Sequence, residues 1–131
     1  MIQTEIRKIQ IPGCVEIFAD NGVIYVVYED GAEVGRELKK EMHVAYMEIT
    51  GGRKMPFLFA NKGNFWIAKD AREYARKIEP KQPFTAVAYW APNLGVRLMA
   101  EFYRKFYKPE IPYQVFGTET EALLWLKQYP A

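Results

Sequence analysis

The chain has 131 residues and a net charge of +2; 50% of its residues are hydrophobic and 26% are charged. This composition excludes a disordered chain and predicts a single globular domain over residues 1–131. The small net charge argues against a nucleic-acid partner, and one cysteine and one histidine exclude an internal disulfide and the common Cys/His metal sites.

The beginning of the chain predicts three strands. Thr4–Gln10 alternates with period 2, and Cys14–Ala19 and Val23–Glu29 flank Asp20-Asn21-Gly22. Asn-Gly between two β-rich runs indicates a hairpin, because both residues tolerate positive φ. Cys14 is expected to be a packed thiol on a strand near the edge of the sheet.

A long helix is expected next, ending at Gly51-Gly52. Its apolar stripe consists of Val34, Leu38, Met42, Ala45, Tyr46 and Ile49. His43 lies nine positions after Val34, about 180° away around the helix, so it should face solvent.

Two continuous apolar runs, Phe57–Ala60 and Phe84–Trp90, are typical of central strands buried on both faces. A shorter helix that Pro80 ends should lie between them. Its apolar positions are Ala71, Tyr74, Ala75 and Ile78.

Two further helices and one strand complete the chain. Pro92-Asn93 opens a third helix, Tyr113–Phe116 is a short strand, and Thr118 caps a last helix in a capping box with Glu121. The expected core side of the last helix is Ala122, Trp125, Leu126 and Tyr129, and that of the third helix is Leu94, Leu98, Phe102 and Phe106. The order of elements predicts an α/β fold, a mixed β-sheet with an N-terminal hairpin and four helices.

The third helix has more apolar residues than one core stripe needs. Met99, Tyr103 and Tyr107 flank the Leu/Phe stripe. Either the helix is buried on two sides, or these three residues form the surface of a homodimer, because Tyr and Met are enriched at such patches.

Polar side chains gather where two buried strands end, which is where open α/β sheets bind ligands. The candidate ligand or partner residues are Asn61, Lys62, Asn64, Asp70, Trp90 and Asn93. No catalytic residue, metal site or cofactor is predicted. A nucleophile needs an adjacent base, the chain has no serine, and no glycine-rich phosphate loop is present.

Residues 53–81 carry eight basic and three acidic side chains. A solvated helix face is the simpler interpretation of this basic segment, and an anionic partner is the alternative. The N-terminus lacks a basic stretch followed by an apolar one. No apolar run reaches the roughly 18 residues of a membrane helix, so we expect a cytoplasmic protein without a membrane span.

Three segments, Lys69–Tyr74, Lys108–Phe116 and Glu121–Lys127, resemble the STAS/SpoIIAA-like superfamily, and more closely an uncharacterised group of small bacterial STAS-like domains. The last two form the pattern K-P-x-x-P, V-F, E-A-x-x-W-L. The resemblance implies a mixed sheet of four to five strands with helices packed against it. It also implies binding of proteins, or of nucleotides or lipids, and a Ser or Thr phosphoacceptor at the start of the helix after the central strand.

Matching Gly63 to the glycine of that superfamily's D-x-S-G-V loop places the aspartate of the loop on Ala60. The resemblance assigns the phosphoacceptor position, at the start of the following helix, to Asp70. Asp70 then has two interpretations, a favourable charge at a helix N-terminus or a mimic of a phosphorylated residue. We therefore expect a non-enzymatic STAS-like regulatory or protein-interaction module with an unknown protein partner. The alternative is a small-ligand domain for lipid or nucleotide, which needs an apolar pocket near Asn61, Phe65, Trp90 and Asn93.

Overall fold

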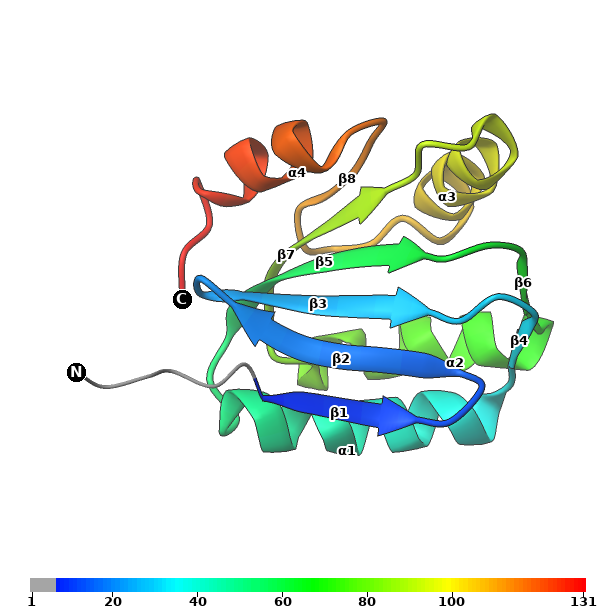
Figure 1. Ribbon diagram of the computed structural model, residues 1–131, viewed down its shortest axis with the longest axis horizontal. Coiled ribbons are helices and arrows are strands. Elements are labelled where there is room, and N and C mark those ends of the chain that lie inside the picture. The colour runs from blue at the N-terminus through cyan, green and yellow to red at the C-terminus, as the bar shows by residue number, and fades with distance from the viewer. Residues whose placement is uncertain (1–6) are drawn as a thin grey trace.

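The computed structural model describes residues 7–131 and contains a six-stranded sheet with helices on both faces (Figure 1). The strands are β1 (Lys8–Ile11), β2 (Val15–Asp20), β3 (Val23–Tyr28), β4 (Ala32–Val34), β5 (Met55–Asn61), β6 (Phe65–Ile67), β7 (Phe84–Trp90) and β8 (Tyr113–Phe116). The helices are α1 (Arg36–Thr50), α2 (Lys69–Ile78), α3 (Leu94–Tyr107), α4 (Glu119–Leu126) and the short 3-10 helix η1 (Glu79–Lys81).

The main sheet has the order β1-β2-β3-β5-β7-β8. The β1–β2 and β2–β3 pairs are antiparallel, and the three remaining pairs are parallel. The predicted mixed sheet is therefore confirmed. So is the hairpin, in which Asn21 and Gly22 have φ values of 50° and 80°, as a two-residue type I′ turn requires. The first predicted strand begins outside the described residues.

The two central strands are also confirmed. β5 lies between β3 and β7, and β7 lies between β5 and β8. Six of the seven residues of β5 are buried, as are the four residues Ala86–Tyr89 of β7. Their continuous apolar runs reflect this burial on both faces.

Each face of the sheet has its own core. Phe57 and Phe59 project to the face that α1, α2 and α3 cover, whereas Leu58 and Ala60 project to the face that α4 covers. Side chains alternate between faces along a strand, so consecutive residues of β5 serve both cores. Figure 1 shows α1 and α2 on one side of the sheet and α4 on the other.

Two short strands were not predicted. β4 and β6 form a separate parallel pair in which Ala32, Glu33 and Val34 face Phe65, Trp66 and Ile67. Three residues are too few for a periodic pattern to emerge. Val34 therefore belongs to β4 and not to the stripe of α1. Cys14 lies in the turn before β2 and not on a strand, and its N–H donates to the Ile11 carbonyl at 3.0 Å.

The orientation of α3 differs from the prediction. The expected core stripe faces solvent: Leu94, Leu98, Phe102 and Phe106 are large exposed hydrophobic residues. Val96, Ala100, Tyr103 and Tyr107 are at least half-buried instead, and Tyr107 is 8% exposed.

Helix geometry explains this difference. A strict four-residue spacing advances about 40° around the helix at each step, so the Leu94–Phe106 stripe winds through about 120°. The spacing from Val96 to Tyr107 alternates four, three and four residues and returns to within about 20°. The straighter of the two stripes packs inward.

The helix ends follow their sequence signals. Gly51 follows α1 with a φ of 66°, the left-handed conformation typical of a helix C-terminus. At α4, the Thr118 hydroxyl accepts from the N–H of Glu121 at 3.3 Å and donates to its carboxylate at 2.8 Å. The predicted N-cap is therefore confirmed, whereas the reciprocal half of the capping box differs, because the Glu121 carboxylate bonds the Thr118 hydroxyl and not the Thr118 backbone N–H.

Candidate functional site

The structure does not bring the six sequence-predicted site residues together. Asn61 and Lys62 lie at the end of β5, where Lys62 Nζ contacts carboxylate oxygens of Glu16 at 3.2 Å and Glu29 at 3.1 Å. These contacts raise the pKa of Lys62, and the hydrogen bond from Lys62 lowers the pKa of Glu16. Lys62 therefore joins strand ends through ion pairs.

The three asparagines organise local backbone. The Asn61 amide donates to the Gly63 carbonyl, and the N–H of Asn64 donates to Asp30 Oδ1 at 2.9 Å. Asn93 caps α3, because its Oδ1 accepts from the N–H groups of Gly95 at 2.8 Å and Val96 at 3.3 Å. Asn residues are common in turns and at helix N-caps for this reason.

The other two predicted residues lie apart from these loops. Trp90 packs against the core under α4. Asp70 lies in the first turn of α2, at a surface hollow that it shares with Arg36, Glu73, Tyr74 and Lys77. The residues near which a pocket was expected, Asn61, Phe65, Trp90 and Asn93, do not line the cavity described next.

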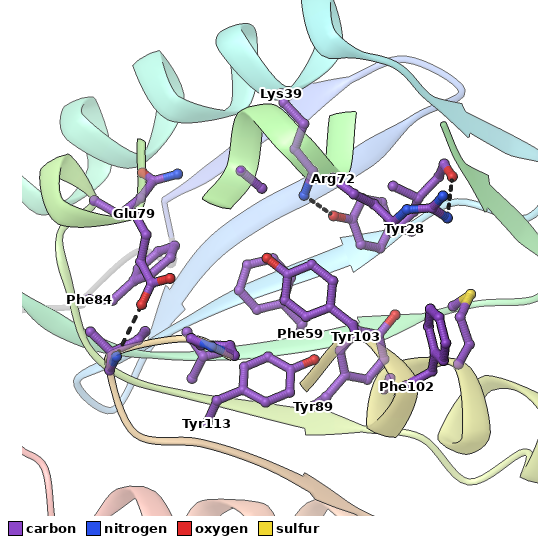
Figure 2. A pocket seen from close by; sticks show the side chains of 18 of the residues that line it. Tyr28, Lys39, Phe59, Arg72, Glu79, Phe84, Tyr89, Phe102, Tyr103 and Tyr113 are labelled. Carbon is purple, nitrogen blue, oxygen red and sulfur yellow. Dashed lines mark hydrogen bonds between the residues drawn. The ribbon is translucent and has the colours of Figure 1, made fainter. Parts of the chain in front are cut away.

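A cavity of about 130 Å³ lies instead between the sheet and the helices α1, α2 and α3. Aromatic side chains line it, and Figure 2 labels all of them except Tyr46. They are Tyr28, Tyr46, Phe59, Phe84, Tyr89, Phe102, Tyr103 and Tyr113. Four neighbouring strands contribute Tyr28, Phe59, Tyr89 and Tyr113, and Phe84 lies at the start of β7. The helices contribute Tyr46, Phe102 and Tyr103. The wall is therefore mainly apolar and carries several hydroxyl groups.

Burial determines the charge state of these tyrosines. It raises the pKa of Tyr46, Tyr89, Tyr103 and Tyr113, because a phenolate is poorly solvated in an apolar wall. All four remain neutral at physiological pH, and all four line the cavity. The Tyr89 hydroxyl is buried without a hydrogen-bond partner among the described residues.

Three charged side chains also line the cavity. Lys39 comes from α1, Arg72 from α2, and Glu79 from η1. Lys39 Nζ donates to the Tyr28 hydroxyl at 2.9 Å, and Arg72 Nη1 donates to the Ile67 carbonyl at 3.3 Å. Glu79 accepts from two backbone N–H groups of the α3–β8 loop. The cavity thus combines a large apolar surface with a few fixed polar groups, as small-molecule sites do.

The predicted solvent-facing position of His43 is wrong. Its ring is half-buried, and Nδ1 lies 2.7 Å from Oε1 of the buried Gln82. Gln82 also lines the cavity. Gln82 belongs to the segment between η1 and β7, and the wheel position of His43 alone could not show that this segment lies against α1.

The cavity residues were not predicted because they come from nine helices and strands and from the loops between them. The residues predicted as a dimer surface belong to this region: Met99 and Tyr103 line the cavity, and the Tyr103 and Tyr107 rings lie 5.0 Å apart. The excess of tyrosines on inward positions was the available signal, since a buried phenol needs a polar partner.

Two absences concern the described part of the chain. Residues 7–131 contain no group of three or more His, Cys, Asp or Glu side chains that could hold a metal ion. Over the same residues, no helix combines the length and the apolar character needed to cross a membrane.

Comparisons with known proteins give a family and a fold. The family model described as "Domain of unknown function (DUF7793)" matches residues 17–130. No curated protein matches the chain. Among solved structures, an uncharacterised protein of the DUF3478 family with a SpoIIAA-like fold, from Shewanella loihica PV-4, is similar at 15% identity and a TM-score of 0.57. That alignment covers 96% of this chain and 98% of the other.

A second solved structure, apo-SiaC from Pseudomonas aeruginosa, is similar at 12% identity and a TM-score of 0.50. It is covered over 98% of its length, against 83% of this chain. At these identities the two likenesses establish the fold. The six-stranded main sheet is larger than the four to five strands that the sequence resemblance implied.

Proposed function

The chain belongs to the DUF7793 family and has a SpoIIAA-like fold, and we propose that it is a non-enzymatic binding module that holds a small, largely apolar ligand between the sheet and α1, α2 and α3. The cavity of about 130 Å³ carries this proposal. An engineered apolar cavity of about 150 Å³ in another protein binds benzene, so the space suits one ring or a short alkyl chain.

The wall supports binding because it is held by the fold itself. Phe59 and Tyr89 lie on β5 and β7, with ring centroids 6.4 Å apart. Tyr28, on β3, is 1% exposed. Side chains on the central strands of a sheet are fixed by their neighbours, so a ligand meets a surface that needs little reorganisation.

Filling the cavity should abolish this binding. Ala75 on α2 is half-buried and lines the cavity. We expect Ala75→Phe to occupy the ligand's space and to leave the melting temperature equal or higher, because the new ring fills a void. Binding of benzyl alcohol, followed by NMR shifts of the cavity tyrosines, measures the effect.

Val44→Phe is the matched control, since it adds the same ring at an exposed position of α1. It should bind benzyl alcohol as the unmodified protein does. Equal binding by the Ala75→Phe variant would show that the probe does not enter this cavity, and the proposal would then be wrong.

The exposed stripe of α3 supports a second candidate, a protein-interaction module whose partner is another copy of the chain. Phe102 and Phe106 stack on the exposed side of the helix, with centroids 5.4 Å apart and planes 16° apart, and Phe102 also lines the cavity. A two-fold dimer would place the same stripe on both sides of the interface. In this second candidate the proposed contact between copies lies on the outer face of α3 and not at Met99, Tyr103 and Tyr107.

Leu98→Glu should convert such a dimer to a monomer. Leu98 is 62% exposed and does not line the cavity, and each dimer would carry two buried carboxylates after the substitution. Light scattering at micromolar concentration measures the mass. Leu124→Glu, on the exposed face of α4, should leave the dimer intact. A monomeric unmodified protein would contradict the homodimer.

A further inference from the structure

The polar groups of the cavity are unevenly placed. Figure 2 shows Lys39, Arg72 and Tyr28 toward one end of the pocket and Glu79 toward the other. Lys39 Nζ donates to the Tyr28 hydroxyl at 2.9 Å and lies 5.6 Å from the Tyr28 ring centroid and 5.9 Å from that of Phe59. The ammonium group therefore sits over aromatic faces at the wall of an apolar space.

Neither cation at this end has a carboxylate partner within residues 7–131. The ion pairs of this part of the chain include neither Lys39 nor Arg72. Arg72 uses one nitrogen for the Ile67 carbonyl, while its Nε is buried without a partner. A buried donor without an acceptor is unfavourable, and a buried charge is more so.

The Tyr89 hydroxyl is a second donor at the cavity that lacks an acceptor among residues 7–131. The Tyr89 hydroxyl is buried without a partner, its residue is 6% exposed, and its ring adjoins Phe59. The Tyr28 hydroxyl accepts from Lys39 and keeps its own proton to donate. Lys39, Arg72, Tyr28 and Tyr89 thus each keep a hydrogen to donate, and Arg72 Nε and the Tyr89 hydroxyl are buried without an acceptor among the described residues.

Glu79 does not balance these cations. Its Oε1 accepts from the N–H groups of Glu110 at 2.8 Å and Ile111 at 3.0 Å. Through Oε1, the Glu79 carboxylate therefore holds the loop between α3 and β8 against η1. At the other end, no carboxylate of residues 7–131 pairs with Lys39 or Arg72.

We propose that the ligand is a monocarboxylate with an apolar body, whose carboxylate meets Lys39, Arg72 and the Tyr28 hydroxyl while its body lies among the aromatic rings. This rests on the proposed function and names the ligand class for the same cavity. Two cations and two hydroxyl donors match an acceptor-only, negatively charged group. The volume limits the enclosed body to about one ring or an equivalent alkyl chain.

Phenylacetate and phenylacetamide test the proposal, because they share one ring and differ in the charge of the head group. We expect phenylacetate to bind more tightly, by NMR titration of the cavity tyrosines. Lys39→Met retains an unbranched apolar side chain and removes the ammonium. It should weaken phenylacetate binding roughly tenfold to a hundredfold, the range of a hydrogen bond to a charged group, and leave phenylacetamide binding unchanged.

Lys40→Met is the matched control. Lys40 is the next residue of α1, carries the same charge and pairs with Glu37 at the surface at 3.3 Å. It should bind both probes as the unmodified protein does. Equal binding of both probes to the unmodified protein, or equal loss in both lysine variants, overturns the carboxylate assignment and leaves the cavity as a site for neutral ligands. Binding of neither probe overturns the assignment and the proposed function together.

Discussion

Replacing Phe57 with alanine is expected to lower the free energy of unfolding by about 3–5 kcal/mol. Phe57 is 0% exposed and lies at the centre of β5. Its ring contacts Phe84 and Tyr46 edge-on, with centroids 4.5 Å and 5.1 Å away. The loss combines the transfer of a large apolar group with a cavity that central strands cannot close.

Urea unfolding followed by circular dichroism measures this change. Phe106→Ala is the matched control, since Phe106 is 66% exposed on α3, and its loss should change stability by less than about 0.5 kcal/mol. Similar losses at both positions would contradict the burial that places Phe57 inside the core and Phe106 outside it.

Ala88→Phe is expected to destabilise the protein by about 1–3 kcal/mol through overpacking. Ala86 and Ala88 of β7 are fully buried, and Ala122 of α4 packs against them. Small side chains on both elements let the helix backbone approach the sheet closely. A phenyl ring at position 88 must displace α4 or adopt a strained rotamer.

The same substitution in a different environment provides the comparison. Ala75→Phe adds an identical ring on the other side of the sheet, into the cavity under α2, and should be neutral or stabilising. Thermal melts of the two variants measure the contrast. If Ala88→Phe melts at the same temperature as the unmodified protein, the close packing of α4 on β7 is wrong.

Much of the fold follows from the sequence because the strongest local signals agree with the tertiary structure. Asn21-Gly22 can form the tight turn of a hairpin with little strain. Phe57–Ala60 has apolar side chains on both faces of the strand, whose exposure to water would be unfavourable, so the strand is expected at the centre of the sheet. β4 and β6 were not predicted, because a strand of three residues is too short to show an alternating hydrophobic pattern. Their pairing also joins residues more than thirty positions apart.

The orientation of α3 shows where pattern alone is insufficient. Both of its stripes are apolar, and the more hydrophobic one, from Leu94 to Phe106, lies outside. The greater hydrophobicity of the Leu94–Phe106 stripe favoured the face that is in fact exposed. The smaller angular spread of the Val96–Tyr107 positions around the helix favoured the face that is in fact buried. A large solvent-facing apolar stripe is itself a departure from the usual rule and points to contact with another molecule.

The candidate site was not predictable from local motifs. Asn61, Asn64 and Asn93 have the polarity of binding residues, but their hydrogen bonds organise loops and a helix cap. Lys39 and Arg72 look like ordinary surface residues of two amphipathic helices. They line one cavity only because α1 and α2 cover the same face of the sheet, which is a property of the assembled fold.

The pairing pattern of the main sheet also orders its assembly in time. The β2–β3 hairpin closes through adjacent residues, and such hairpins form in about 1–10 μs. The β3–β5 and β5–β7 pairs join Ile24 to Phe57 and Phe57 to Val87, so each must wait for a helical crossover and its loop-closure entropy. We therefore expect the β2–β3 hairpin to form before the parallel pairs of the sheet, and the exposed side of β3 then offers a pairing edge to β5.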